Sequence, residues 1–177
     1  MINNKFSHVS VHEMAHFVVY LYVGGPVDKL REIQLKPTSG WFQNQSFSVA
    51  ENYLANCCLT LGGPVSDVLI SMKEANKNDI IKAKDTIRRG LLSSDLDASE
   101  LAVQSEYEAA WRLTEGIITE QKELICRLAE QGINLMNASN LISCNKVKKL
   151  GQAILDEWYD NETNYYSHPR MVKIRSS

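Results

Sequence analysis

The sequence predicts a mainly α-helical protein with a small β-sheet, that is, an α+β fold. Apolar residues recur at spacings of three and four over most of the 177 residues, which is typical of helices that pack on a core. Residues 27–47 depart from this pattern, because their apolar spacing is close to two and Pro37-Thr38-Ser39-Gly40 provides a turn. With 44% hydrophobic and 23% charged residues, the chain can bury one good core.

Charge and hydropathy argue against several classes of function. The formal net charge of −2 provides no electrostatic attraction for nucleic acid or for an anionic membrane surface, so neither is expected as a partner. No apolar run reaches the roughly 18 residues of a membrane-spanning helix, and the N-terminus lacks the features of a signal peptide. We therefore expect a soluble, cytoplasmic protein without membrane insertion. The four cysteines show no CxxC spacing and are expected to be free thiols in the core.

The most informative stretch lies in the first predicted helix, residues 9–22. It contains His12-Glu13-Met14-Ala15-His16, whose two histidines are four positions apart and therefore share one face of a helix. Zinc favours a tetrahedral shell of imidazole and carboxylate ligands, with one position left for water in catalytic sites. The spacing predicts His12 and His16 as zinc ligands and Glu13 as the catalytic base that acts on this water. The alternative is a helix with two satisfied histidines and a surface glutamate.

A β-hairpin is expected to follow this helix. Gly24-Gly25-Pro26 should end the helix, since glycine accepts the left-handed cap and proline cannot continue the hydrogen-bond ladder. A strand edge beside the metal helix could hold an extended peptide through main-chain hydrogen bonds, with Ile33, Leu35 and Trp41 as candidate substrate contacts. A sheet that merely covers the metal helix is an equally good interpretation.

Two further helices are expected after the hairpin. A capping-box pattern at Ser48 and Glu51 predicts the start of a second helix, which can continue with a kink at Pro64 to about residue 72. A third helix opens near Asn76 and has Asp79 in its first turn.

The remaining residues are expected to be helical up to a polar tail. Apolar residues at 101–128 suit an antiparallel helix pair, and one more helix should follow. We therefore assign residues 1–92 to a zinc-site subdomain that contains the metal helix, the small sheet and two further helices. Residues 93–159 are expected to form a C-terminal helical layer of the same domain, and residues 160–177 a flexible tail.

Two histidines supply only part of a metal shell, so a third ligand is expected from elsewhere in the chain. Spacing alone leaves five candidates open, namely Glu51, Asp67, Glu74, Asp79 and His168. An aspartate in the first turn of a helix is most often a cap that interacts with the helix dipole. The residues by themselves therefore do not single out Asp79.

Four motifs follow one another along the chain. They are His-Glu-x-x-His, a Val-x-Lys-Leu-x-x-Ile-x-Leu-x-Pro strand at 27–37, Leu-Gly-Gly at 61–63, and Asn-Asp-Ile-x-x-Ala at 78–83. In order and spacing they resemble the peptidase domain of FtsH-type ATP-dependent zinc proteases. Residues 106–111 and 124–129 also look like that family's C-terminal helices, so the resemblance covers nearly the whole chain.

This resemblance implies a zincin-like helical metallopeptidase domain. It implies that Asp79 completes the zinc shell with His12 and His16, and that Glu13 activates the water. The chain departs from the family pattern at Ala15, where glycine is usual, and at residues 64–67, where Pro-Val-Ser-Asp replaces the usual Arg-x-Ala-Glu. These changes leave the implied ligands intact, but they could alter packing behind the metal or contacts between subunits.

No AAA+ ATPase module and no transmembrane helix precede the metal motif in this sequence. The domain is therefore expected to act without an unfolding motor, on unfolded proteins, short peptides or substrates supplied by a partner. A homo-oligomer and an association with a partner ATPase both stay open.

Together these features predict a zinc-dependent metalloendopeptidase, a hydrolase that uses Zn²⁺ to cleave unfolded or extended peptide segments. One alternative is a binding or regulatory module, derived from such a peptidase, that has kept the metal site. A more distant alternative is a helical interaction protein without a metal. Metal content distinguishes the last possibility from the first two, and the chemistry of Glu13 distinguishes those two from each other.

Overall fold

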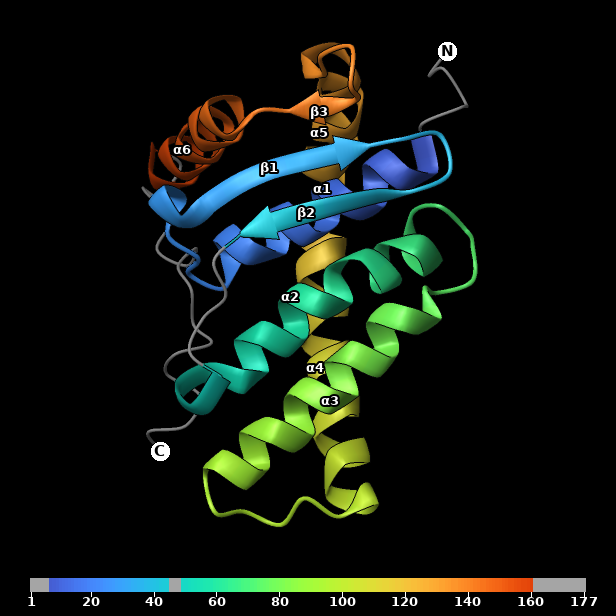
Figure 1. Ribbon diagram of the computed structural model, residues 1–177, viewed down its shortest axis with the longest axis vertical. Coiled ribbons are helices and arrows are strands. Elements are labelled where there is room, and N and C mark those ends of the chain that lie inside the picture. The colour runs from blue at the N-terminus through green and yellow to red at the C-terminus, as the bar shows by residue number, and fades with distance from the viewer. Residues whose placement is uncertain (1–6, 45–48, 161–177) are drawn as a thin grey trace.

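The computed structural model describes residues 7–44 and 49–160 (Figure 1). In these residues the protein is mainly helical with a small three-stranded antiparallel sheet, which confirms the predicted α+β class. The elements are α1 (Ser7–Tyr22), a 3-10 helix (Val27–Lys29), β1 (Leu30–Leu35), β2 (Gly40–Asn44), α2 (Val49–Leu69), α3 (Lys77–Ser93), α4 (Glu100–Glu120), α5 (Lys122–Leu135), β3 (Leu141–Ile142) and α6 (Cys144–Asp160).

Helix α1 is the central element of the core. Residues 17–21 are at most 2% exposed, because α1 packs against the sheet, α2 and α5. The helix begins at Ser7, two residues earlier than the sequence predicts, so Ser10 lies inside it and does not cap its start. The buried Ser10 hydroxyl instead donates to the Ala129 carbonyl of α5 at 2.7 Å. The helix ends as predicted, with Gly24 at a φ of 89°.

The sheet has the strand order β2-β1-β3, and it covers one side of α1 (Figure 1). The hairpin of β1 and β2 is confirmed, with Ile33 opposite Phe42. On its other side, β1 pairs with β3, where Ile33 lies opposite Ile142. β3 was not predicted, because two residues are too few to show a strand periodicity. Within the described chain, β1 is thus the central strand and β2 is an edge strand.

Helices α2 and α3 run side by side in opposite directions below α1 (Figure 1). α2 continues through Pro64, and its non-helical residue is Asn52 rather than the proline, with φ −154° and ψ 54°. α3 opens as predicted, since the Asn76 side chain accepts hydrogen bonds from the backbone N–H groups of Asn78 and Asp79. The predicted capping box lies outside the described residues at Ser48, and the described part of the structure does not include the Glu51 side chain.

Helices α4 and α5 follow one another along the long axis of the molecule, with Gln121 between them, and do not form the expected antiparallel pair (Figure 1). α4 packs on α2, α5 crosses α1, and α6 packs beside β1. The predicted subdomain of residues 1–92 and the helices after it therefore share one core. None of the described helices has an apolar stretch long enough to cross a bilayer. The expected tail lies outside the described residues from 161 onward.

The burial of the four cysteines gives a test of this packing. Cys57 and Cys58 have no exposed surface, and burial raises the pKa of the Cys58 thiol to about 11 and that of Cys57 still further. Cys126 and Cys144 are partly exposed. Because the thiolate is the reactive form, about two thiols per chain should react with a disulfide reagent at pH 8, and the other two only after unfolding. Rapid reaction of all four in the folded protein would contradict the packing of α2.

Candidate metal centre

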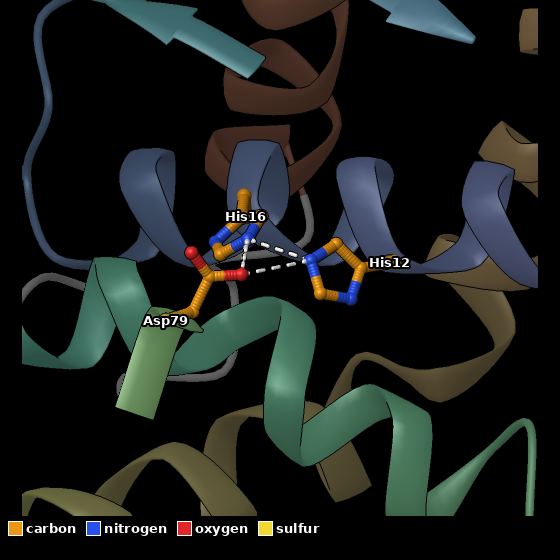
Figure 2. A group of neighbouring side chains, drawn as sticks. All are labelled: His12, His16 and Asp79. Carbon is orange, nitrogen blue, oxygen red and sulfur yellow. Dashed lines mark hydrogen bonds and ion pairs between the residues drawn. The ribbon is translucent and has the colours of Figure 1, made fainter. Parts of the chain in front are cut away.

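Three side chains from two distant parts of the chain converge in front of α1 (Figure 2). His12 and His16 come from successive turns of α1, and their Nε2 atoms lie 3.2 Å apart. Asp79, from the first turn of α3, places Oδ2 at 3.3 Å from Nε2 of His12 and 4.0 Å from Nε2 of His16. The three residues form a largely buried group that could hold a metal ion.

The other nitrogen of each imidazole is held by an acceptor on α2. Nδ1 of His12 lies 3.0 Å from both carboxylate oxygens of Asp67, and Nδ1 of His16 lies 2.7 Å from the Leu59 carbonyl. A carbonyl oxygen can only accept, so Nδ1 of His16 carries the proton. These contacts fix the rings with both Nε2 atoms directed at Asp79, as in metal sites where an outer carboxylate or carbonyl orients a histidine ligand.

Two consecutive glycines of α2 make this close approach possible. A Cβ at Gly62 would lie 3.0 Å from the Ala15 carbonyl oxygen, and a Cβ at Gly63 would overlap the Nε2 atoms of both His12 and His16. The space beside the two imidazoles therefore exists because residue 63 has no side chain. Ala15, which departs from the family pattern, is buried against Gly62 without disturbing the histidines.

Zinc fits this group of donors. A tetrahedral ion with ligand distances of about 2.0 to 2.1 Å keeps its donor atoms roughly 3.3 Å apart. Two of the three separations, 3.2 Å and 3.3 Å, match this value, and a small movement of Asp79 toward His16 would shorten the third from 4.0 Å. Two imidazoles and one carboxylate also form a ligand set that catalytic zinc sites use.

The Asp79 carboxylate is positioned from both sides. Its backbone N–H donates to the Asn76 side chain, which caps α3 and so orders its first turn. Lys82, one turn further on, binds Oδ1 at 2.8 Å. Oδ2 is thereby left to face His12 and His16, so Lys82 favours a single-oxygen contact with a metal.

The charges in this group are strongly coupled. Burial disfavours the charged form of His12, but hydrogen bonds to Asp67 and Asp79 outweigh it and raise the pKa of His12 to about 10. Burial and the nearby His12 charge lower the pKa of His16 to about 4. Burial alone would raise the pKa of Asp79, yet hydrogen bonds to His12 and Lys82 hold it well below its usual range. His12 is therefore the protonated imidazole of the pair, and His16 is the neutral one.

Glu13 lies beside the metal-binding group and lines the same cleft. It is only 5% exposed, and burial raises its pKa to about 7 against the opposing effect of the His12 charge. The turn into β2 comes very close to it, because a Cβ at Gly40 would lie 2.8 Å from Cγ of Glu13. The edge strand therefore begins next to the residue that the sequence predicts as the base.

The other candidates for the third ligand lie elsewhere. Asp67 contacts the outer nitrogen of His12, and it also lies 3.1 Å from Nε2 of His8. Glu74 is exposed at the cleft, and His168 lies outside the described residues. The orienting role of Asp67 was missed because spacing does not distinguish a ligand from a residue that supports one. The signal available was its position, where the resembled family usually has glutamate.

Of the three candidate substrate contacts, two lie in the core and one lies at the surface. Ile33 and Leu35 are almost completely buried, and β1 is paired on both sides, so neither residue can contact a peptide in the cleft. The sequence did not place them in the core, because the alternation of a strand shows two faces but not which strand lies at the edge. Trp41, on β2, is 38% exposed and lines the cleft.

The role of Gly63 can be tested by adding one methyl group. Gly63→Ala should lower zinc affinity at least about a hundredfold, because the new Cβ would displace both imidazoles from their aligned positions. Zinc content and competition with a chromogenic chelator measure the effect, with about one zinc per chain expected in the wild type. Gly116→Ala is the matched control, since its Cβ meets nothing within 4 Å. Normal zinc binding by Gly63→Ala would contradict the site.

A matched pair of variants separates the ligand from its support. Asp79→Asn should lower zinc affinity by well over a hundredfold, because an amide is a poor zinc ligand. Asp67→Asn removes the charge beside Nδ1 of His12 but keeps a hydrogen-bond acceptor there, so zinc affinity should fall only about tenfold. Chelator competition at one pH measures both. Equal losses would remove the distinction between the two aspartates.

Comparison of the sequence with protein-family models gave no match, and no curated protein matched it.

Proposed function

We propose that this protein is a zinc-dependent metalloendopeptidase of the FtsH-peptidase type. The observation that carries the proposal is the convergence of His12, His16 and Asp79 in the cleft that also contains Glu13. Two histidines alone could be core residues that serve only packing. Three donors at distances suited to zinc, next to a buried glutamate, form the arrangement that metal-assisted peptide hydrolysis needs.

Each residue of the site has a separate role in the proposed reaction. A zinc ion held by His12, His16 and Asp79 would supply a water of lowered pKa and a Lewis acid for the scissile carbonyl. Glu13 accepts a proton as the water oxygen bonds to the carbonyl carbon, and it returns that proton to the peptide nitrogen as the C–N bond breaks. Asp67 and the Leu59 carbonyl keep the imidazoles aligned, and Lys82 keeps Asp79 aligned.

The cleft suits an extended peptide. Its volume of about 810 Å³ is in the range of ligand sites, and β2 forms part of its wall. Because β2 is an edge strand among the described residues, it can offer main-chain hydrogen bonds to a peptide that adds to the sheet. We therefore propose unfolded or extended segments as substrates. A folded substrate would first need unfolding by a partner, such as a separate ATPase.

Replacing the base tests the catalytic step directly. Glu13→Gln keeps the size of the side chain but cannot accept the proton, so casein cleavage should fall at least about a hundredfold while zinc content stays normal. Cleavage by the wild type should also stop with a chelator and return with added zinc.

Glu74→Gln is the matched control for this variant, since Glu74 lines the same cleft but is exposed and outside the metal-binding group. It should cleave casein at close to the wild-type rate. If the zinc-loaded wild type and Glu13→Gln behave alike across casein and peptide libraries, the retained metal site belongs to a binding module and not to a peptidase.

A further inference from the structure

The cleft that contains the metal-binding group continues along α3. Asp79, Lys82, Thr86 and Arg89 all line it, and their spacings of three, four and three place them on one face of the helix. Asp79 and Arg89 are ten positions apart, which corresponds to about 15 Å of helix. An extended peptide advances about 3.3 Å per residue, so this distance spans four to five residues of substrate.

The two walls of this part of the cleft differ in charge. On the α2 side, the lining residues before Asp67 are Asn56, Leu59 and Thr60, which carry no charge. On the α3 side, beyond Asp79, the charged lining residues are Lys82 and Arg89, and both are cationic. A peptide that leaves the metal in this direction therefore meets positive charge along one wall.

Arg89 differs from its neighbours in what it binds. Lys82 pairs with Asp79, and Arg88 pairs with Asp85 at 3.0 Å and with Glu100 at 2.6 Å. The Arg89 Nε donates a long hydrogen bond of 3.4 Å to the Asp85 carbonyl. Among the side chains that the structure describes, which do not include that of Glu51, no carboxylate forms an ion pair with Arg89. Its charge is therefore presented to the cleft.

We propose that Arg89 binds a carboxylate of the substrate, four to five residues from the scissile bond. This inference rests on the proposed peptidase function and adds a substrate class to it, namely acidic peptides. A guanidinium is suited to this role, because its planar N–H groups bind a carboxylate in a bidentate way. The carboxylate can belong to an Asp or Glu side chain or to the C-terminus of the peptide, since both present the same group.

Binding to the zinc-loaded Glu13→Gln protein tests this subsite without any cleavage. The probes are fluorescein-labelled peptides of Ala, Ser and Gln with an amidated end, which carry one Glu at each position in turn. A second set has no Glu and ends in a free carboxylate at different lengths. Glu at one or two adjacent positions, or a free end at one length, should tighten binding about tenfold over the neutral peptide. The gain should shrink at high salt.

Substitutions assign this gain to one residue. In the same background, Arg89→Gln should abolish the preference for the acidic peptide, and Arg89→Glu should reverse it in favour of Lys at that position. Arg88→Gln is the matched control and should keep the preference, because Arg88 is engaged with Asp85 and Glu100. In the enzyme with Glu13 intact, Arg89→Gln should raise KM for the acidic peptide and leave kcat unchanged.

The outcomes separate the two proposals. If casein is cleaved in a Glu13-dependent manner but acidic and neutral peptides bind alike, the Arg89 subsite is wrong and the peptidase function stands. If acidic peptides bind through Arg89 but nothing is cleaved, the cleft is a peptide-binding site without catalysis. If Arg88→Gln abolishes the preference as fully as Arg89→Gln, the preference comes from the overall positive charge of this region, and the proposal of a specific Arg89 subsite is wrong.

Discussion

The close contact between α1 and α2 is the constraint on which the rest of the site depends. Packed helices normally lie about 8 to 10 Å apart, and smaller residues at the contact bring them nearer. Here Gly62 and Gly63 face Ala15 and the imidazoles directly. This approach brings the Leu59 carbonyl and the Asp67 carboxylate to the outer nitrogens of the two histidines. A bulkier pair of residues would separate the helices and leave both rings without their supports.

The site also places several charged carboxylates in a buried region, where they contribute little to the stability of the fold. Asp67 is 1% exposed, and Asp79 and Glu13 are nearly as buried, so three carboxylates lie within the same poorly solvated region. Burying charged groups costs free energy that pairing seldom fully offsets. Burial raises the pKa of Glu13, and hydrogen bonds to His12 and Lys82 lower that of Asp79 despite its burial; strongly shifted pKa values cluster at functional sites more often than in structural cores. The arrangement is therefore better explained by what it binds than by a contribution to stability.

The surroundings of the metal-binding group suggest how a substrate would lie. On one side, β2 offers an edge of main-chain groups that begins beside Glu13. On another, α3 carries Asp79, Lys82 and Arg89 along one face of the cleft. Main-chain pairing is insensitive to sequence, whereas a positive charge at a fixed distance selects among peptides. The same helix thus supplies a candidate metal ligand and a candidate determinant of specificity.

Local features of the sequence were sufficient to predict much of this arrangement. The common face of His12 and His16 follows from the helical repeat, and the start of α3 follows from the capping preference of Asn76. The hairpin follows from a change of apolar period and a turn. These features depend on residues within a few positions of one another, which a single sequence contains.

Tertiary packing decided which of these residues meet in the site and which lie in the core. Whether Asp67 or Asp79 faces Nε2 depends on how α2 and α3 are placed against α1, and spacing along the chain carries no information about that placement. β1, which carries Ile33, became the central strand because β3, from more than a hundred residues later, occupies its second edge. The sequence alone therefore determined which residues could perform the chemistry. The packing of helices and strands distant in the chain decided which of them meet, because contact across a core depends on shape and burial and not on local periodicity.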